Sequence, residues 1–136
     1  MNENQEVFAG GVCIRDGKIL LIHKINEERL FNKEYFAFPR LTLQNESIDE
    51  GLHRIFTEYG MTIELGELLH SNEDDVLEYY YVCRPIFGEL KPFSVDITTA
   101  DTEKQFSVPI WISLTELDDL IVYPETLKNI VLENLN

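Results

Sequence analysis

The chain has 136 residues, of which 44% are hydrophobic and 26% are charged, a composition typical of one folded domain spanning residues 1–136. Its 25 acidic and 11 basic side chains give a formal net charge of -14, which argues against binding DNA or RNA through a broad basic surface. The first residues lack the features of a signal peptide and no apolar run is long enough to cross a membrane, so we expect a cytoplasmic protein.

The chain is expected to open with a β-hairpin. Residues 7–14 and 19–25 are apolar runs, and an Asp-Gly pair between them favours a tight turn. Residues 26–33 are charged and mixed in character, which is typical of a loop. Residues 34–38 then predict a short aromatic strand, which ends at Pro39 because proline cannot donate a hydrogen bond within a sheet.

The clearest helix is expected between residues 47 and 60. Ser47 and Glu50 fit a capping box, in which the two side chains satisfy free amide groups at the start of a helix. Gly60 is well placed to end the helix, because glycine readily adopts the backbone conformation found just beyond a helix C-terminus. The apolar residues recur at helical spacing and form one stripe, made of Ile48, Leu52, Ile55, Phe56 and Tyr59.

The second half of the chain is expected to contain three strands, a helical turn and a terminal helix. The strands are predicted at residues 61–69, 76–87 and 105–113, the turn at 115–120 and the helix at 124–135. Pro124 suits the first turn of a helix. This order of strands and helices predicts an α/β (α+β) sandwich.

Three further side chains are expected to be buried. Cys13 and Cys83 lie within strand-like runs, and in a reducing cytoplasm we expect two buried thiols rather than a disulfide. Trp111 lies in an apolar strand and is expected to pack in the core.

Several segments resemble, in this order, the Nudix (MutT-like) hydrolase family. The Gly-Gly pair at residues 10–11 followed by residues 18–22 resembles the opening hairpin of that family, and residues 33–39 resemble the strand before its signature. The helix at residues 46–61 stands where the Nudix helix belongs, and residues 108–117 resemble a late strand and turn. The resemblance implies a Nudix-like α/β/α sandwich with a mixed central sheet, and hydrolysis of nucleoside diphosphate-linked compounds.

The signature of the family is G-x5-E-x7-R-E-U-x-E-E-x-G-U, in which U is a bulky aliphatic residue. Glutamates at positions i, i+3 and i+4 share one helical face and offer oxygen ligands to Mg²⁺ or Mn²⁺. The metal then stabilises charge on a diphosphate while water attacks. Here residues 40–42, Arg-Leu-Thr, stand where the family has glycines after Pro39, so the signature is degenerate from its start.

The helix fits the signature in two ways that differ by one residue. Aligned from its start, Glu46 matches the first glutamate and Arg54 the arginine, and the three ligand positions fall on Ile55, Glu58 and Tyr59. Aligned from its end, Gly60 matches the late glycine, and the three positions fall on Arg54, Thr57 and Glu58. In both alignments, Glu58 is the one carboxylate that remains.

The resemblance makes Glu58 and Glu46 the candidate metal ligands. Glu58 is also explained as a solvated partner of Arg54, which we expect to pair with Glu58 or Glu50, each four residues away. As a ligand-binding residue, Arg54 is a candidate phosphate contact, because its guanidinium matches the paired oxygens of a phosphate.

Other candidates lie outside the signature. Glu103 is a further candidate catalytic residue and, with Asp101, lies where the family sometimes has a catalytic acid or base; a charged loop is the alternative. Tyr79 and Tyr81 share one face of a strand and are candidates for stacking on a nucleobase, although aromatic residues also favour strands for packing alone. His53 lies on the polar side of the helix and is expected to be a surface residue.

Three functions follow from these observations. The favoured one is a Nudix-type protein with weak or no hydrolysis, retained to bind a nucleotide-like small molecule or a partner. The second is an active Mg²⁺- or Mn²⁺-dependent pyrophosphohydrolase that uses replacement carboxylates. The third is a dimer-forming interaction module without a small-molecule ligand. The replacement carboxylates would come from Glu46, Glu50, Glu58, Asp101 or Glu103.

Overall fold

The strands form two mixed sheets. The computed structural model describes residues 6–27, 32–91, 95–99 and 103–135. One sheet has the order β5-β1-β7-β6, with strands β5 (Arg40–Thr42), β1 (Val7–Val12), β7 (Leu77–Gly88) and β6 (Met61–Asn72). The other has the order β10-β4-β3-β9-β8, with strands β10 (Val122–Tyr123), β4 (Asn32–Ala37), β3 (Lys18–Glu27), β9 (Glu103–Ser113) and β8 (Val95–Thr99), while β2 (Ile14–Arg15) pairs with β3. Parallel pairing of β1 with β7 and of β10 with β4 makes both sheets mixed.

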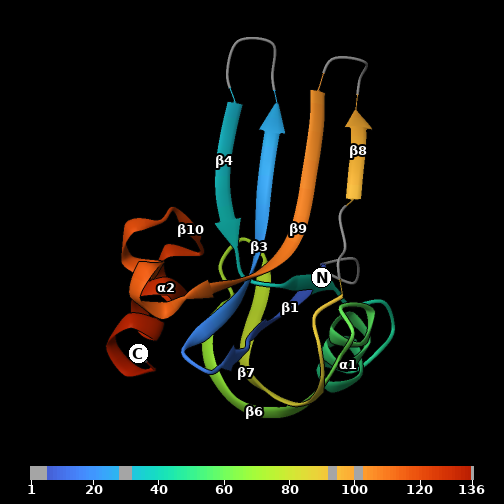
Figure 1. Cartoon of the computed structure of the whole chain (residues 1–136). Helices are drawn as coiled ribbons and strands as arrows, with labels where there is room; N and C mark the ends of the chain where they lie inside the picture. Colours follow the sequence, from blue (N-terminus) through green and yellow to red (C-terminus); the bar gives the residue numbers. More distant parts are fainter. Residues whose placement is uncertain (1–5, 28–31, 92–94, 100–102, 136) are drawn as a thin grey trace.

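The two helices cover opposite sides of the strands, as Figure 1 shows for α1 (Ile48–Glu58) and α2 (Glu125–Asn134). Successive residues of a strand point to opposite faces, and β3 uses this alternation to build two hydrophobic clusters. Leu21 packs in the α2 cluster, which includes Leu127 and Val131 of that helix. Leu20 packs on the other face in the α1 cluster, which includes Leu52, Ile55 and Phe56 of that helix. The expected α/β/α sandwich is therefore confirmed, with its strands divided between two sheets.

The expected opening hairpin forms next to its turn but does not extend into β1. Ile14 pairs with Ile19 around a turn in which Asp16 and Gly17 both have positive φ, at 53° and 77°. Such a turn matches the twist of the strands that it joins. Strand β1, expected to form the rest of the hairpin, pairs instead with β7 and β5 in the other sheet. Long-range pairing therefore overrides the local turn signal.

Close packing explains the glycine pair of β1. A Cβ atom on Gly10 would lie 2.3 Å from the Tyr80 ring and 2.8 Å from the carbonyl oxygen of Pro39. A Cβ atom on Gly11 would lie 2.7 Å from the sulfur of Cys83. All three distances are shorter than van der Waals contact, so β1 can approach its neighbours because these two positions have no side chain.

Several element boundaries differ from those expected. Pairing of β3 with β4 continues to Glu27 and Asn32, so part of the expected loop at residues 26–33 is strand. Strand β9 begins at Glu103, where it pairs with the unexpected strand β8. In Figure 1 these strands extend beyond the layer between the helices. These pairings join segments on either side of a turn and depend on the arrangement of the sheet.

The remaining differences are small. Strand β6 continues to Asn72, short β5 follows Pro39, and a 3₁₀ helix η1 (Leu114–Asp119) takes the place of the expected turn. Helix α2 begins at Glu125 with Pro124 as its N-cap residue, one residue later than expected. Neither helix in the described ranges has the length and apolarity that a membrane crossing requires.

The cysteines are buried and form no disulfide, as expected. Burial raises the pKa of the Cys13 and Cys83 thiols to about 12, so both stay protonated near neutral pH. Trp111 is partly buried against the α1 cluster, and Arg15 lies over its ring at 5.8 Å from the ring centroid.

Candidate functional site

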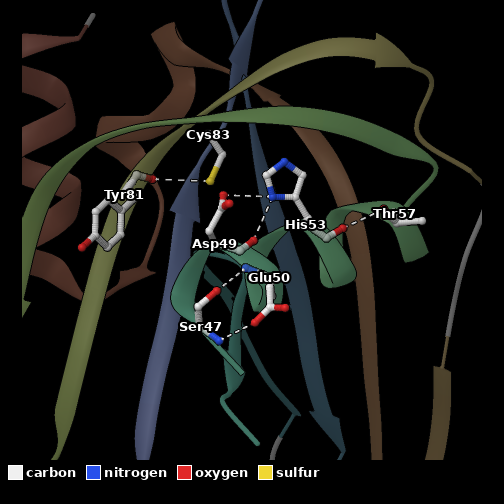
Figure 2. Close-up of polar contacts among 7 residues, drawn as sticks. All are labelled: Ser47, Asp49, Glu50, His53, Thr57, Tyr81 and Cys83. Carbon is white, nitrogen blue, oxygen red and sulfur yellow. Dashed lines mark hydrogen bonds and ion pairs between the residues drawn. The ribbon is translucent and has the colours of Figure 1, made fainter. Parts of the chain in front are cut away.

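The start of α1 is held by the expected capping box. The Ser47 amide donates to a Glu50 carboxylate oxygen at 2.9 Å, and the Glu50 amide donates to the Ser47 hydroxyl oxygen at 3.1 Å (Figure 2). Gly60, with a φ of 96°, follows the last turn. The carboxylate of Glu50 is therefore occupied by the backbone of its own helix.

An ion pair joins the loop before α1 to the body of the helix. Arg54 donates to both carboxylate oxygens of Glu46, at 3.1 Å from its Nε and 2.7 Å from its terminal nitrogen. The hydrogen bond from Arg54, followed by one from the amide of Gln44, holds the pKa of the Glu46 carboxyl below its usual range. The expected pairing of Arg54 with Glu58 or Glu50 is therefore wrong, because Glu46 is placed so that both of its oxygens accept from the guanidinium, while Glu50 accepts from the Ser47 amide.

This ion pair has the spacing of the alignment from the helix start, whereas Gly60, with its positive φ, fits the alignment from the helix end. The first glutamate and the arginine of the family signature are eight residues apart, as Glu46 and Arg54 are here. With these two residues as the reference, the three ligand positions fall on Ile55, Glu58 and Tyr59. Ile55 is 9% exposed and Tyr59 is 8% exposed, and both pack in the α1 cluster. Burial also raises the pKa of the Tyr59 hydroxyl, which leaves it neutral.

The residues on the described part of the helix do not fit a divalent metal ion. Mg²⁺ and Mn²⁺ prefer several charged or carbonyl oxygens, and the three positions offer one carboxylate, an aliphatic side chain and a neutral phenol. Within the described ranges, no three His, Cys, Asp or Glu side chains lie close enough together to hold a metal. Asp101 lies outside the described residues, and for Glu103 the backbone at the start of β9 is described.

His53 lies on the outer face of α1. Its Nδ1 atom is 2.8 Å from the carbonyl oxygen and 3.1 Å from a carboxylate oxygen of Asp49, one turn earlier (Figure 2). The His53 side chain is 42% exposed. These contacts place it in a local surface pair within the helix, as the sequence indicated.

A pocket of about 710 Å³ lies beside Tyr59, the C-cap residue of α1. Tyr59 forms part of its wall, together with side chains from both sheets and from the start of α2. The lining residues are Phe8, Ile22, Lys24, Tyr35, Ala37, Phe38, Arg40, Leu41, Thr42, Tyr59, Glu78, Tyr80, Ser107, Tyr123 and Pro124. The volume lies in the range of pockets that hold small molecules.

Charged side chains lie at one wall of the pocket. Arg40 forms an ion pair with Glu78, and its guanidinium lies over the ring of Phe8, 4.3 Å from the centroid. Tyr80 donates a hydrogen bond to the same Glu78 oxygen at 3.3 Å. Lys24 also lines the pocket, and its pKa is lowered by burial and then by the charge of Arg40. The pocket thus has two cations that could contact an anionic ligand.

Aromatic rings form much of the remaining wall. Tyr35 and Tyr123 meet edge to face with their centroids 5.6 Å apart, and Phe38 and Tyr80 meet in the same way at 6.4 Å. Tyr80 is buried, whereas Tyr123 is 53% exposed at the rim. Such walls offer flat apolar surfaces and phenol groups to a planar ring.

The tyrosines that the sequence singled out do not line this pocket. Tyr79 donates a hydrogen bond to Glu73 at 2.7 Å, and Tyr81 packs against the α1 cluster. Tyr80, between them, points to the other face of β7 and lines the pocket. Sequence reasoning also missed Lys24 and Arg40, although Arg40 stands at a position where the family has glycine.

Comparison with known proteins identifies the fold. The sequence matches no family model and no curated protein. Among solved structures, an ADP-ribose pyrophosphatase from Streptococcus suis 89-1591 is 16% identical with a TM-score of 0.64, and the match covers 98% of this chain and 93% of that one. A NUDIX hydrolase from Nitrosomonas europaea is 15% identical with a TM-score of 0.63, and the match covers 94% and 86%.

A third structurally similar protein is longer than this chain. A protein named as a candidate oxidoreductase from Sinorhizobium meliloti 1021 is 15% identical with a TM-score of 0.65, and the match covers 96% of this chain but 40% of that one. The chain therefore spans less than half of that protein. At these identities the likenesses show the fold, and the expected Nudix-like fold is confirmed.

Proposed function

We propose that this protein uses the Nudix fold to bind a nucleotide-like small molecule in the pocket, and that it has lost most or all metal-dependent hydrolysis. The observations that carry the proposal are that no three His, Cys, Asp or Glu side chains converge within the described ranges, and that Arg54 occupies both carboxylate oxygens of Glu46. Aligned from the helix start, the buried Ile55 and Tyr59 stand at two ligand positions, and aligned from its end Arg54 and Thr57 do.

The pocket supplies the contacts that a nucleotide-like ligand requires. A ring can pack against the tyrosine and phenylalanine side chains, as nucleobases do on aromatic residues elsewhere. An anionic group can reach Arg40 or Lys24, which supply the positive charge that a metal supplies in an active hydrolase. One of the structurally similar proteins is named an ADP-ribose pyrophosphatase, which is consistent with a ligand of this class.

An active hydrolase would need carboxylates from elsewhere in the chain. Glu46 is paired with Arg54, and Glu50 is part of the capping box. Using either one as a ligand would break a contact at the start of α1. Glu58 is exposed, and a single carboxylate holds Mg²⁺ weakly, because the ion retains most of its water. These contacts leave few free carboxylates for a metal ion, which supports ligand binding without hydrolysis.

Calorimetric titration in buffer with EDTA tests the proposal. Wild-type protein is titrated with adenosine and with AMP, and the same titrations are repeated with Arg40→Gln. We expect saturable binding of both by the wild type, and weaker binding of AMP by Arg40→Gln, by about tenfold, since a charged contact contributes 1–3 kcal/mol. Arg84→Gln is the matched control, because Arg84 pairs with Glu64 outside the pocket lining.

The outcomes separate the three functions. Binding in EDTA without phosphate release supports the proposal. Binding and phosphate release that both require Mg²⁺ or Mn²⁺ would contradict it and favour an active hydrolase. The absence of binding by any nucleoside or nucleotide, together with a dimer in sedimentation, would favour an interaction module.

A further inference from the structure

The charges that line the pocket do not balance. Lys24 and Arg40 are cations, and Glu78 is an anion whose side chain is 12% exposed. Arg40 is already paired with Glu78, which also accepts the hydrogen bond from Tyr80. Among the ion pairs of the described residues, none includes Lys24. Of the lining cations, Lys24 is therefore the one whose charge is not compensated in the described part of the chain.

These lining charges limit the net charge of a ligand that the pocket can hold. A singly charged anion beside Lys24 gives a neutral site, whereas each additional negative charge faces the Glu78 carboxylate and a protein of net charge -14. Phosphate-binding proteins offset such charge with several cations or with a metal ion. The described helix positions do not fit a metal, so Lys24 and a partly neutralised Arg40 must carry this role.

We infer that the pocket selects a singly charged anion joined to an aromatic ring, and that Glu78 sets this selectivity by neutralising Arg40. The inference rests on the proposed function and adds the charge class of the ligand. A phosphodiester or a carboxylate fulfils this description. Nucleoside diphosphates and triphosphates, which carry three or four charges near neutral pH, do not.

The experiment compares ligands that share a ring and differ in charge. Wild-type protein is titrated in EDTA with adenosine, cyclic AMP, AMP and ADP, whose charges at pH 7.5 run from zero to about three. We expect cyclic AMP to bind more tightly than AMP, and AMP more tightly than ADP. Indole-3-acetate, a ring-bearing carboxylate, distinguishes a carboxylate ligand from a phosphodiester.

Two variants test the role of the lining charges. Glu78→Gln frees Arg40, so the affinity for ADP should rise about tenfold, the affinity for cyclic AMP should rise less, and the affinity for adenosine should stay within about twofold. Lys24→Gln should weaken the binding of cyclic AMP about tenfold more than that of adenosine, because adenosine carries no charge for Lys24 to contact. The second variant keeps the inference testable if Glu78→Gln fails to fold. Glu64→Gln is the control, because it removes the same charge from a surface Glu–Arg pair.

The outcomes distinguish this inference from the proposed function. Tighter binding of ADP than of cyclic AMP by the wild type, or an unchanged ratio of the ADP and cyclic AMP affinities in Glu78→Gln, would overturn the inference while nucleotide binding stands. Failure of adenosine and every nucleotide to bind would overturn both. The expected order in the wild type, together with a change of this ratio in Glu78→Gln but not in Glu64→Gln, supports both.

Discussion

The guanidinium of Arg54 donates to both carboxylate oxygens of Glu46, and the two residues are eight positions apart. This contact matches the spacing that the Nudix signature has between its first glutamate and its arginine. In the alignment that starts from these two residues, Ile55 and Tyr59 stand at two ligand positions, and in the other alignment Arg54 and Thr57 do. The pair joins the loop before α1 to the body of the helix, and each alignment retains one carboxylate, Glu58.

The Glu46–Arg54 pair is expected to stabilise the protein above the pKa of an unfolded glutamate, about 4.3. Hydrogen bonding lowers the pKa of folded Glu46, so this stabilisation is lost as the pH falls through that lowered value. Glu46→Gln should therefore be less stable than the wild type at pH 6, and the difference should shrink below pH 4. Urea denaturation across this range measures it, with Glu64→Gln as the charge-matched control. If the difference in free energy of unfolding between Glu46→Gln and the wild type did not change with pH, the ionised pair would not be what stabilises the wild type.

Restoring the carboxylates of the signature should damage the fold rather than restore a metal site. Ile55→Glu places a charge at a position that is 9% exposed within the α1 cluster, and an unpaired buried charge costs about 3 kcal/mol or more. The double variant Ile55→Glu/Tyr59→Glu should be less stable still, with and without Mg²⁺. Denaturation of each variant provides the test. A double variant that regains wild-type stability in millimolar Mg²⁺ would contradict the burial of this face.

Gly10→Ala should destabilise the protein by about 1–3 kcal/mol, because the added methyl group would collide with the Tyr80 ring and the Pro39 carbonyl. The collision also involves a residue of the pocket wall, so adenosine should bind more weakly. Thermal unfolding and calorimetry measure the two effects. Unchanged values for both would mean that β1 and β7 do not approach as closely as described.

The affinity for a singly charged ligand should fall as the pH rises, and the fall should begin at a lower pH than it would for a lysine with its usual pKa. Burial and Arg40 lower the pKa of Lys24, so the amine loses its charge below the usual lysine value of about 10.4. Tyr59 and Tyr80 stay neutral there because burial raises their pKa. Titrations with cyclic AMP from pH 7 to pH 10 should show the fall.

Lys24→Arg is the matched variant for this pH series. An arginine keeps its charge throughout the range, so the affinity of this variant should depend less on pH. Equal pH profiles for Lys24→Arg and the wild type would show that another group controls binding.

Local signals in the sequence predicted the parts of the fold that depend on neighbouring residues. The capping box of Ser47 and Glu50 and the helix end at Gly60 are both present. The separation of β1 from the opening hairpin was missed, because it depends on pairing with β7, some seventy residues away. Strand β8 was missed because it has five residues and is formed by its pairing with β9.

The candidate site was less predictable than the fold. The resemblance directed attention to the helix, where Glu46 and Arg54 turned out to pair with each other. The pocket depends on which face of a strand each side chain occupies and on which strands meet. Tyr80 could not be separated from Tyr79 and Tyr81 by sequence, because all three favour strands equally. Lys24 and Arg40 come from strands in different sheets, and the fold alone brings them together.

The most direct test of the account is a calorimetric titration of the wild-type protein with AMP, performed once in EDTA and once in 5 mM Mg²⁺. The pocket is expected to bind AMP with the same affinity in both buffers, and no phosphate should be released in either, because its own cations contact the anion. Binding or phosphate release that requires Mg²⁺ would contradict the account, since the metal would then supply the charge assigned here to Lys24 and Arg40.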